Sequence, residues 1–335
     1  MDKYILAFVV SLVVATIISP IIIKLASSLK ASQTVLDYVK EHKSKSGTPT
    51  LGGLIFILTA LVALAFFSQN YSLALISLGA MFSYGILGFL DDFIKIKFKQ
   101  NLGLRPYQKI IGQVGIATII AFFAYYSNLV GSKIYVPFVS YTIDLGWLVI
   151  PFIILVFIAV TNSVNLTDGL DGLATGVSIA YLLGFVSLLM IYRNIAANDT
   201  LAMEYNNMII LIACVLGALF GFLCFNCFPA KIFMGDTGSL ALGGLLASLA
   251  VFSRLELIIP IIGFMFVASS LSVILQVLHF KRTKKRIFKM APLHHHFQQC
   301  GVHENRITLV YIVITIALSC LVVMITIFAG DVWKI

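Results

Sequence analysis

The sequence predicts an all-α polytopic membrane protein, and three observations lead to this fold class. Hydrophobic residues make up 60% of the 335 residues and charged residues only 11%, a composition far from that of a soluble globular domain. The hydrophobic residues fall into blocks of roughly 17 to 25, the length of a helix that crosses a hydrocarbon core about 30 Å thick. Lysine and arginine are concentrated in alternate connections between these blocks, which indicates a membrane topology.

The hydrophobic blocks predict ten membrane-spanning helices. Their ranges are 3–23, 52–68, 73–90, 108–127, 145–162, 173–192, 207–225, 237–253, 256–280 and 306–329. The first block has no small-residue cleavage site, so it is expected to remain as a span rather than to be removed as a signal peptide. Because no long polar stretch is left over, residues 1–335 are expected to form a single integral membrane domain.

The distribution of basic residues predicts the orientation of the chain. Most of the 23 lysines and arginines lie in residues 24–51, 91–109, 226–236 and 280–306. Short loops rich in these residues stay in the cytoplasm, so five loops are expected on the cytoplasmic side and both termini outside. Basic loops beside anionic lipid headgroups then account for the formal charge of +9, and no nucleic-acid partner is required.

Two adjacent carboxylates end the third block, in F-L-D-D-F-I-K. Asp91 and Asp92 would lie at a helix C-terminus, where the helix dipole disfavours negative charge. Lys95, one helical turn after Asp91, or a divalent metal could compensate this charge. A solvated helix end is the structural alternative, and at this point both interpretations stay open.

A second polar cluster lies in V-N-L-T-D-G-L-D-G-L-A. Asp168 and Asp171 are three residues apart, which places them on one face if they open the sixth helix. Thr167 or Asp168 could instead cap that helix, but a cap would explain one aspartate and not the whole cluster with Asn162 and Asn165.

Two further motifs carry groups that suit phosphate. Asp236 lies between glycines in F-M-G-D-T-G-S, where the backbone N–H groups of a helix N-terminus could receive phosphate oxygens and Asp236 could hold a cation. Thr237 or Ser239 could alternatively be a simple cap. The run A-P-L-H-H-H-F lacks the one-turn spacing of a zinc helix. In a loop its histidines could each donate to phosphate or sugar oxygens, whereas a chance run, or one that binds lipid headgroups, is the alternative.

Together these motifs predict magnesium-dependent phosphoryl transfer. Carboxylates gathered at one membrane border repel one another unless a cation binds, and oxygen ligands alone favour Mg²⁺. Basic loops and glycine-rich turns suit phosphate, and the membrane setting implies a lipid substrate. The C-x-x-C pair Cys224 and Cys227 has no second pair, so buried apolar cysteines are favoured over a zinc or redox site.

At these residues the chain resembles the phospho-N-acetylmuramoyl-pentapeptide transferase family, of the polyprenyl-phosphate N-acetylhexosamine-1-phosphate transferase superfamily. The resemblance covers nearly the whole chain and rests on six motifs in this order. They are K-S-G-T-P-T-L-G-G from Lys45, D-D-F-I-K from Asp91, N-L-G-L from Asn101, N-S-V-N-L-T-D-G-L-D-G-L-A from Asn162, F-M-G-D-T-G-S-L-A-L-G-G from Phe233 and A-P-L-H-H-H-F from Ala291. One departure is that Gln298 and Gln299 follow the histidines, where the family leads one to expect an acidic residue.

The resemblance implies an enzyme of the bacterial cytoplasmic (inner) membrane, with its active site on the cytoplasmic face. It would join UDP-N-acetylmuramoyl-pentapeptide to undecaprenyl phosphate, giving lipid I and UMP, with Mg²⁺ as cofactor, membrane lipid around it and a homodimer as the assembly. The residues that match catalytic positions are Asp91, Asp92, Asp236 and His294, with Asp236 as the metal ligand. The residues that match substrate-binding positions are Lys45, Lys95, Asn165, Asp168, Asp171, Asn226, Phe233, His295 and His296.

Two other functions remain alternatives. Within the superfamily, a transferase that uses UDP-N-acetylglucosamine would share most of these motifs. An ion-coupled transporter would also place acids in spans, but it should hide them at mid-membrane, whereas these acids lie at one border.

Overall fold

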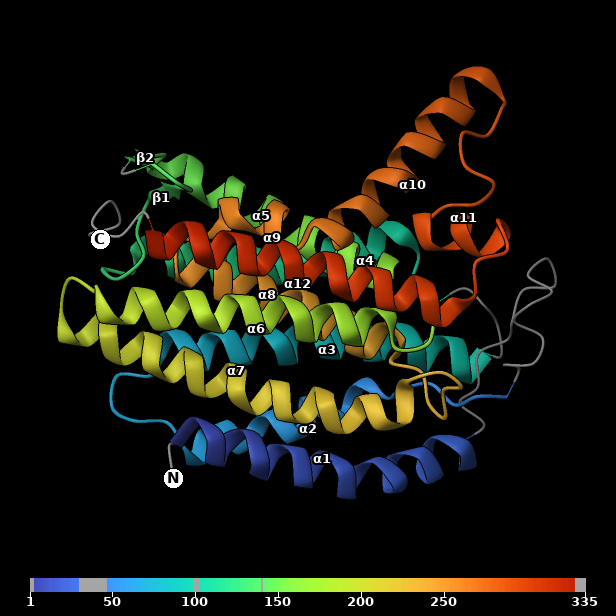
Figure 1. The fold of residues 1–335 in the computed structure, drawn as a ribbon, viewed down its shortest axis with the longest axis horizontal. Helices are drawn as coiled ribbons and strands as arrows, with labels where there is room; N and C mark the ends of the chain where they lie inside the picture. Colours follow the sequence, from blue (N-terminus) through green and yellow to red (C-terminus); the bar gives the residue numbers. More distant parts are fainter. Residues whose placement is uncertain (1–2, 30–46, 99–102, 140, 329–335) are drawn as a thin grey trace.

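The computed structural model describes residues 3–29, 47–98, 103–139 and 141–328, and these are almost entirely helical (Figure 1). The helices of the first half are α1 (Lys3–Ser28), α2 (Gly53–Ala60), the 3₁₀ helix η2 (Leu61–Ala65), α3 (Ser72–Phe98), α4 (Pro106–Tyr126), η3 (Gly146–Leu148) and α5 (Val149–Thr167). Those of the second half are α6 (Leu173–Asn194), α7 (Asp199–Asn226), α8 (Gly235–Phe252), η4 (Glu256–Ile258), α9 (Ile259–Ile262), α10 (Phe264–Thr283), α11 (Leu293–Gln299) and α12 (Glu304–Phe328). Strands β1 (Lys133–Val136) and β2 (Tyr141–Asp144) form an antiparallel hairpin.

The predicted fold class is confirmed. Within the described ranges, nine helices are long and apolar enough to cross a membrane: α1, α3, α4, α5 with η3, α6, α7, α8, α10 and α12. Apart from α10, they run roughly along the long axis of the molecule, with the hairpin at one end and α11 at the other (Figure 1). Helix α1 begins and α12 ends at the hairpin end, and the orientation of that end in the membrane stays a prediction.

Two of the ten predicted blocks differ from simple spans. Block 52–68 forms the shorter apolar helix Gly53–Ala65, which is less than the roughly 20 residues of a full crossing. Its first residues are held inside the protein, since Gly52 N and Gly53 N donate to the carbonyls of Phe233 and Met234 at 2.9 Å each. Block 256–280 is broken at Gly263 into α9 and α10, and α10 then leaves the bundle at an angle (Figure 1).

Helix α8 is the centre of the bundle and is almost completely buried. It packs along α3, α5 and α2, and small residues allow the closest approaches. A Cβ on Gly88 of α3 would lie 2.1 Å from the backbone oxygen of Asp236, so only glycine fits there. This contact brings the end of α3 against the beginning of α8, at the end of the bundle opposite the hairpin.

Candidate active site

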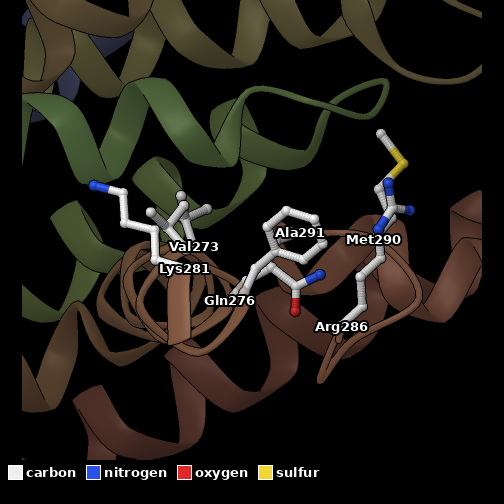
Figure 2. A pocket seen from close by; sticks show the side chains of 8 residues that line it. Val273, Gln276, Lys281, Arg286, Met290 and Ala291 are labelled. Carbon is white, nitrogen blue, oxygen red and sulfur yellow. The ribbon is translucent and has the colours of Figure 1, made fainter. Parts of the chain in front are cut away.

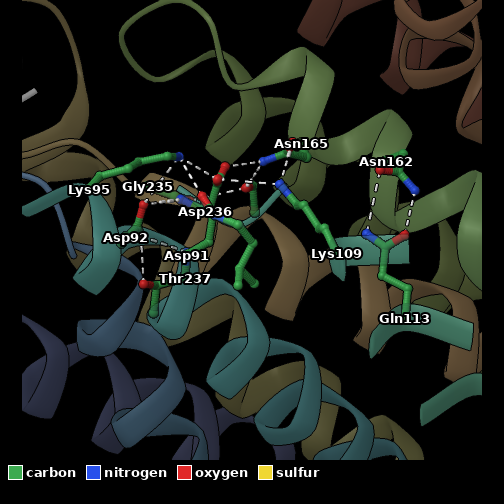
Figure 3. Close-up of polar contacts among 12 residues, drawn as sticks. Asp91, Asp92, Lys95, Lys109, Gln113, Asn162, Asn165, Gly235, Asp236 and Thr237 are labelled. Atoms are coloured by element: carbon green, nitrogen blue, oxygen red, sulfur yellow. Dashed lines mark hydrogen bonds and ion pairs between the residues drawn. The ribbon is translucent and has the colours of Figure 1, made fainter. Parts of the chain in front are cut away.

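Three aspartates meet where α3 ends and α8 begins (Figure 3). One carboxylate oxygen of each of Asp91, Asp92 and Asp236 lies within 4.8 Å of the others. Asp91 and Asp92 are buried, with 3% of each residue exposed, and Asp236 is half-buried. Neighbouring buried carboxylates repel one another strongly, so this cluster requires positive charge.

Asp92 binds the N-terminus of α8. Its Oδ2 accepts hydrogen bonds from Thr237 N at 2.8 Å and Thr237 Oγ1 at 2.7 Å, and its Oδ1 accepts from Asp236 N at 3.2 Å. A carboxylate at this position compensates the positive end of the helix dipole. The prediction that these N–H groups receive phosphate is therefore wrong for Asp236 and Thr237, because Asp92 already occupies both.

Asp91 faces a different neighbour, the segment before α4. Its Oδ1 accepts a hydrogen bond from Leu104 N at 2.8 Å, and its Oδ2 lies 2.6 Å from Lys95 Nζ. A Cβ on Gly103 would come within 2.6 Å of Oδ1, so this backbone passes directly over the carboxylate. One oxygen of Asp91 therefore contacts a cation, whereas both oxygens of Asp92 accept hydrogen bonds from protein donors.

Two lysines supply the positive charge. Lys95 Nζ lies 2.6 Å from Asp236 Oδ2 as well as from Asp91, and 3.9 Å from Asp92 Oδ1. Lys109 Nζ, on α4, lies 3.3 Å from the same oxygen of Asp236. The sequence analysis identified Lys95 as a site residue but not Lys109, which lies outside the six motifs. The sequence feature that could have indicated Lys109 is its four-residue spacing to Gln113, because the two form a polar stripe on an otherwise apolar span.

Asn165 and the amide pair beside it join α5 to this cluster. Asn165 Nδ2 donates to Asp236 Oδ1 at 2.5 Å and to Ser239 Oγ at 2.8 Å, while Asn165 Oδ1 accepts from Lys109 Nζ at 3.3 Å. One turn earlier, Asn162 Nδ2 donates to Gln113 Oε1 at 2.8 Å (Figure 3). These bonds fix the position of α4 and α5 relative to α8.

Asp168 and Asp171 lie in the turn between α5 and α6, and α6 begins only at Leu173. The prediction that both aspartates open the sixth helix is therefore wrong; the left-handed φ of +69° at Gly172 separates them from it. Burial raises the pKa of Asp168 to about 8, and the charges of Asp236 and Asp92 add to this shift. Asp168 therefore belongs electrostatically to the same site.

Asp171 holds neighbouring segments together. Its Oδ2 accepts from Ala230 N at 2.9 Å, and its backbone N donates to Glu304 Oε1 at the start of α12 at 2.6 Å. Asn226 acts similarly: it is buried, donates to the carbonyl of Ile232 at 3.0 Å and accepts from Thr175 Oγ1 at 2.7 Å. Both side chains shape the loop between α7 and α8.

Phe233 is placed at the edge of that loop. Its N donates to the carbonyl of Pro49 at 2.8 Å, its carbonyl accepts from Gly52, and its side chain remains partly exposed. The backbone of the 49–52 segment is thereby joined to the loop that carries Asp236. Lys45, predicted to lie in the same site, is outside the described residues.

The histidines lie on the short helix α11, which corrects the expectation of a loop. His294 is completely buried, and a Cβ on Gly169 would lie 2.2 Å from His294 Nε2 and 3.0 Å from His295 Nε2. These two rings therefore face the turn that carries Asp168. His296 faces elsewhere: its Nδ1 accepts from Lys289 N at 3.1 Å and its ring packs on Phe288.

A groove of about 480 Å³ lies beside α11, between α10 and the segment that follows it (Figure 2). Its walls are largely apolar, but Lys281 and Arg286 line it. Gln276 holds the segment in place, since its Oε1 accepts from Ile287 N and Phe288 N at 3.0 Å each. The groove therefore combines apolar surface with two cations.

The donor set of the cluster fits Mg²⁺. All the available ligand atoms are carboxylate oxygens, which are the ligands that this cation prefers. Asp91 Oδ2 is buried, and its positively charged partner is the ammonium group of Lys95. Asp236 and Asp91 are the residues that would hold the ion. Asp92 fits this role less well because its oxygens bind α8.

The chain is similar to known proteins over most of its length. Residues 73–254, which include Asp91, Asp92 and Asp236, match the model of glycosyl transferase family 4. Over 312 residues the chain is 44% identical to a phospho-N-acetylmuramoyl-pentapeptide-transferase of Clostridioides difficile (strain 630), covering 92% of this chain and 94% of the relative.

Relatives of the same name from two other organisms are similar to the same extent. The protein of Clostridium kluyveri is 45% identical over 96% of this chain and 98% of its own length. That of Thermoanaerobacter sp. (strain X514) is 45% identical over 94% of this chain and 96% of its own. The chain therefore belongs to glycosyl transferase family 4 and, within it, to the phospho-N-acetylmuramoyl-pentapeptide transferases.

Proposed function

We propose that this protein transfers phospho-N-acetylmuramoyl-pentapeptide from UDP-N-acetylmuramoyl-pentapeptide to undecaprenyl phosphate, giving lipid I and UMP. The observation that carries the proposal is the cluster of Asp91, Asp92, Asp236 and two lysines in a chain with relatives of this name. Carboxylates that bind a cation, next to ammonium groups, are the side chains that phosphoryl transfer requires.

In this reaction an oxygen of the lipid phosphate forms a bond to the β-phosphorus, which carries the sugar, and the bond between this phosphorus and the bridging oxygen of UMP breaks. Asp236 and Asp91 would hold Mg²⁺, which would supply positive charge to neutralise the pyrophosphate. Lys95 and Lys109 now pair with the carboxylate of Asp236, and each can leave it to bind phosphate oxygens of the two substrates. Asp91 orients the lipid phosphate or accepts its proton.

The covalent alternative, a phospho-aspartate intermediate, uses the same residues in two steps. Of the two adjacent aspartates, the geometry favours Asp91 for it, because the oxygens of Asp92 are occupied by donors of α8. Trapping a labelled sugar-phosphate on Asp91 would establish the covalent route and overturn direct attack.

The groove of Figure 2 is the proposed binding surface for the polyprenyl chain of the lipid substrate. Its apolar walls suit that chain, and Lys281 and Arg286 suit a phosphate that passes on to Asp91 and Lys95. We further propose that the site faces the cytoplasm of a bacterial cell and that the protein is a homodimer. The basic residues on the segments around the site support that orientation.

The test is UMP release by purified protein given UDP-N-acetylmuramoyl-pentapeptide, with and without undecaprenyl phosphate and Mg²⁺. We expect release to require all three and to be lost in Asp236→Ala, while Cys224→Ser, an exposed residue of α7, serves as the control. Release only with UDP-N-acetylglucosamine would move the protein to the sister function. Ion flux in vesicles without either nucleotide sugar would favour a transporter.

A further inference from the structure

A second cavity lies inside the bundle and shares no residue with the site described above. Its volume is about 130 Å³, and it is enclosed by α5, α6, α8 and the broken segment from η4 to α10. Leu246 and Phe266 are typical of its walls, which are mostly apolar. Glu256, which lines it, follows the end of α8 that lies away from the aspartate cluster.

Three buried polar side chains line this cavity: Ser163, Tyr181 and Glu256. Ser163 Oγ accepts a hydrogen bond from Ser270 Oγ at 2.7 Å, whereas the other two each have an oxygen in need of a partner. Glu256 is 4% exposed and Tyr181 is 1% exposed. Within the part of the chain that the structure describes, neither Glu256 Oε2 nor the Tyr181 hydroxyl has a hydrogen-bond partner. Buried polar groups in native proteins are nearly always hydrogen-bonded, so these two atoms point to an occupant of the cavity.

The chemistry of the two groups indicates what that occupant carries. Burial raises the pKa of Glu256 to about 8, against the lowering effects of a backbone hydrogen bond and of Arg254, and this favours the protonated carboxyl near neutral pH. A protonated carboxyl and a phenol each donate and accept one hydrogen bond. A hydroxyl group also does both, whereas an ion of either sign would be left unneutralised between them.

The walls indicate the rest of the occupant. Ala159 and Pro260 line the cavity and are also exposed on the outside of the bundle, Ala159 in the middle of a membrane-spanning helix. The cavity therefore lies just beneath the outer surface of the bundle. Its volume is similar to that of an apolar protein cavity of about 150 Å³ that binds benzene.

We propose that this cavity binds the hydroxyl end of a neutral aliphatic alcohol, which enters from the membrane between α5 and α9. The hydroxyl exchanges hydrogen bonds with Glu256 and Tyr181, and the hydrocarbon part fills the apolar wall. This inference does not depend on the transferase activity, since the cavity residues are separate from the aspartate cluster.

The test is photolabelling of the full chain in liposomes with 3-azioctanol, followed by mapping of the labelled residues by mass spectrometry. We expect label on Glu256 or Tyr181, and we expect 1-octanol to compete while octane, which lacks the hydroxyl, does not. Tyr181→Phe should weaken the competition by octanol about fivefold, the loss of one neutral hydrogen bond.

A matched pair of variants separates the cavity from the general lipid-facing surface. Ala159→Phe should block the entrance and abolish labelling, whereas Leu155→Phe, on the same helix and 62% exposed but outside the cavity lining, should not. Equal competition by octane, label spread over the exposed residues of α5 and α10, or no label at all would overturn the proposal. The last result would mean that water alone satisfies the two oxygens.

Discussion

The closest backbone contact beside the aspartate cluster offers a sharp test of how the site is positioned. In Gly88→Ala the new Cβ would lie 2.1 Å from the carbonyl oxygen of Asp236, about 1.3 Å short of the 3.4 Å at which ordinary contacts begin. The new Cβ is fixed to the backbone of α3, and the atoms that it meets belong to the backbone of α8. The two helices must therefore move apart by about that distance. Asp91 and Asp92 move with α3, whereas Asp236 moves with α8.

A displacement of about 1 Å between catalytic groups costs about a hundredfold in rate, and overpacking of this kind costs about 1–3 kcal/mol in the free energy of unfolding. We therefore expect Gly88→Ala to release UMP about a hundredfold more slowly, with a lower unfolding temperature. The assay measures kcat at saturating Mg²⁺ and both substrates, together with thermal unfolding in the same detergent.

The control is Gly79→Ala, on the same helix. A Cβ on Gly79 meets nothing within 4 Å, so this change should keep kcat within about twofold and stabilise α3 slightly. If Gly88→Ala kept the full rate at normal stability, the contact between α3 and α8 would not be what sets the distance between the aspartates.

Three further predictions concern neighbouring residues. In Thr237→Val, Asp92 loses a hydrogen bond of 2.7 Å, so we expect the free energy of unfolding to fall by about 2 kcal/mol in denaturant titrations, with Thr237→Ser as the control. In Gly169→Ala a Cβ 2.2 Å from His294 Nε2 should displace this ring and reduce kcat by about tenfold or more; an unchanged kcat would show that the position of His294 is not important. The pKa of Asp168, about 8 in the folded protein against 3.8 ordinarily, means that the folded state binds more protons than the unfolded state between these values. In the presence of a chelator, the unfolding temperature should therefore fall as pH rises from 6 to 9 in the wild type, and Asp168→Asn should reduce this fall.

The hydrophobic pattern predicted most of the membrane helices because a helix that crosses a bilayer needs about 20 predominantly apolar residues. It was misleading for Gly53–Ala65, which is too short for a full crossing. Its first residues bond to the backbone before α8, while Leu58, Leu61 and Leu64 are exposed, so this short helix has the same apolar composition as a span. The break at Gly263 was missed for a similar reason. Hydropathy does not distinguish a continuous helix from two consecutive apolar ones.

Most residues of the candidate site could be found from the sequence because the chain has few polar residues outside its loops, so any polar group at the end of a span was conspicuous. Their individual contacts could not be found in this way. Asn226 and Asp171 were predicted to bind substrate, and in the structure they bond to the loop before α8. Contact with substrate stays a prediction for both, since the same loop that they hold also carries Phe233 and Asp236.

The adjacent aspartates illustrate most clearly what sequence spacing leaves open. Successive residues of a helix point about 100° apart, so Asp91 and Asp92 accept hydrogen bonds from different segments, although Lys95 lies near both. Asp92 faces the beginning of α8, where donors from Asp236 and Thr237 hold it, and Asp91 faces Lys95 and Leu104. Loss of activity in either variant would thus have different causes: without Asp92 the helix that carries Asp236 loses its anchor, whereas without Asp91 the site loses a charge that can bind a cation or substrate.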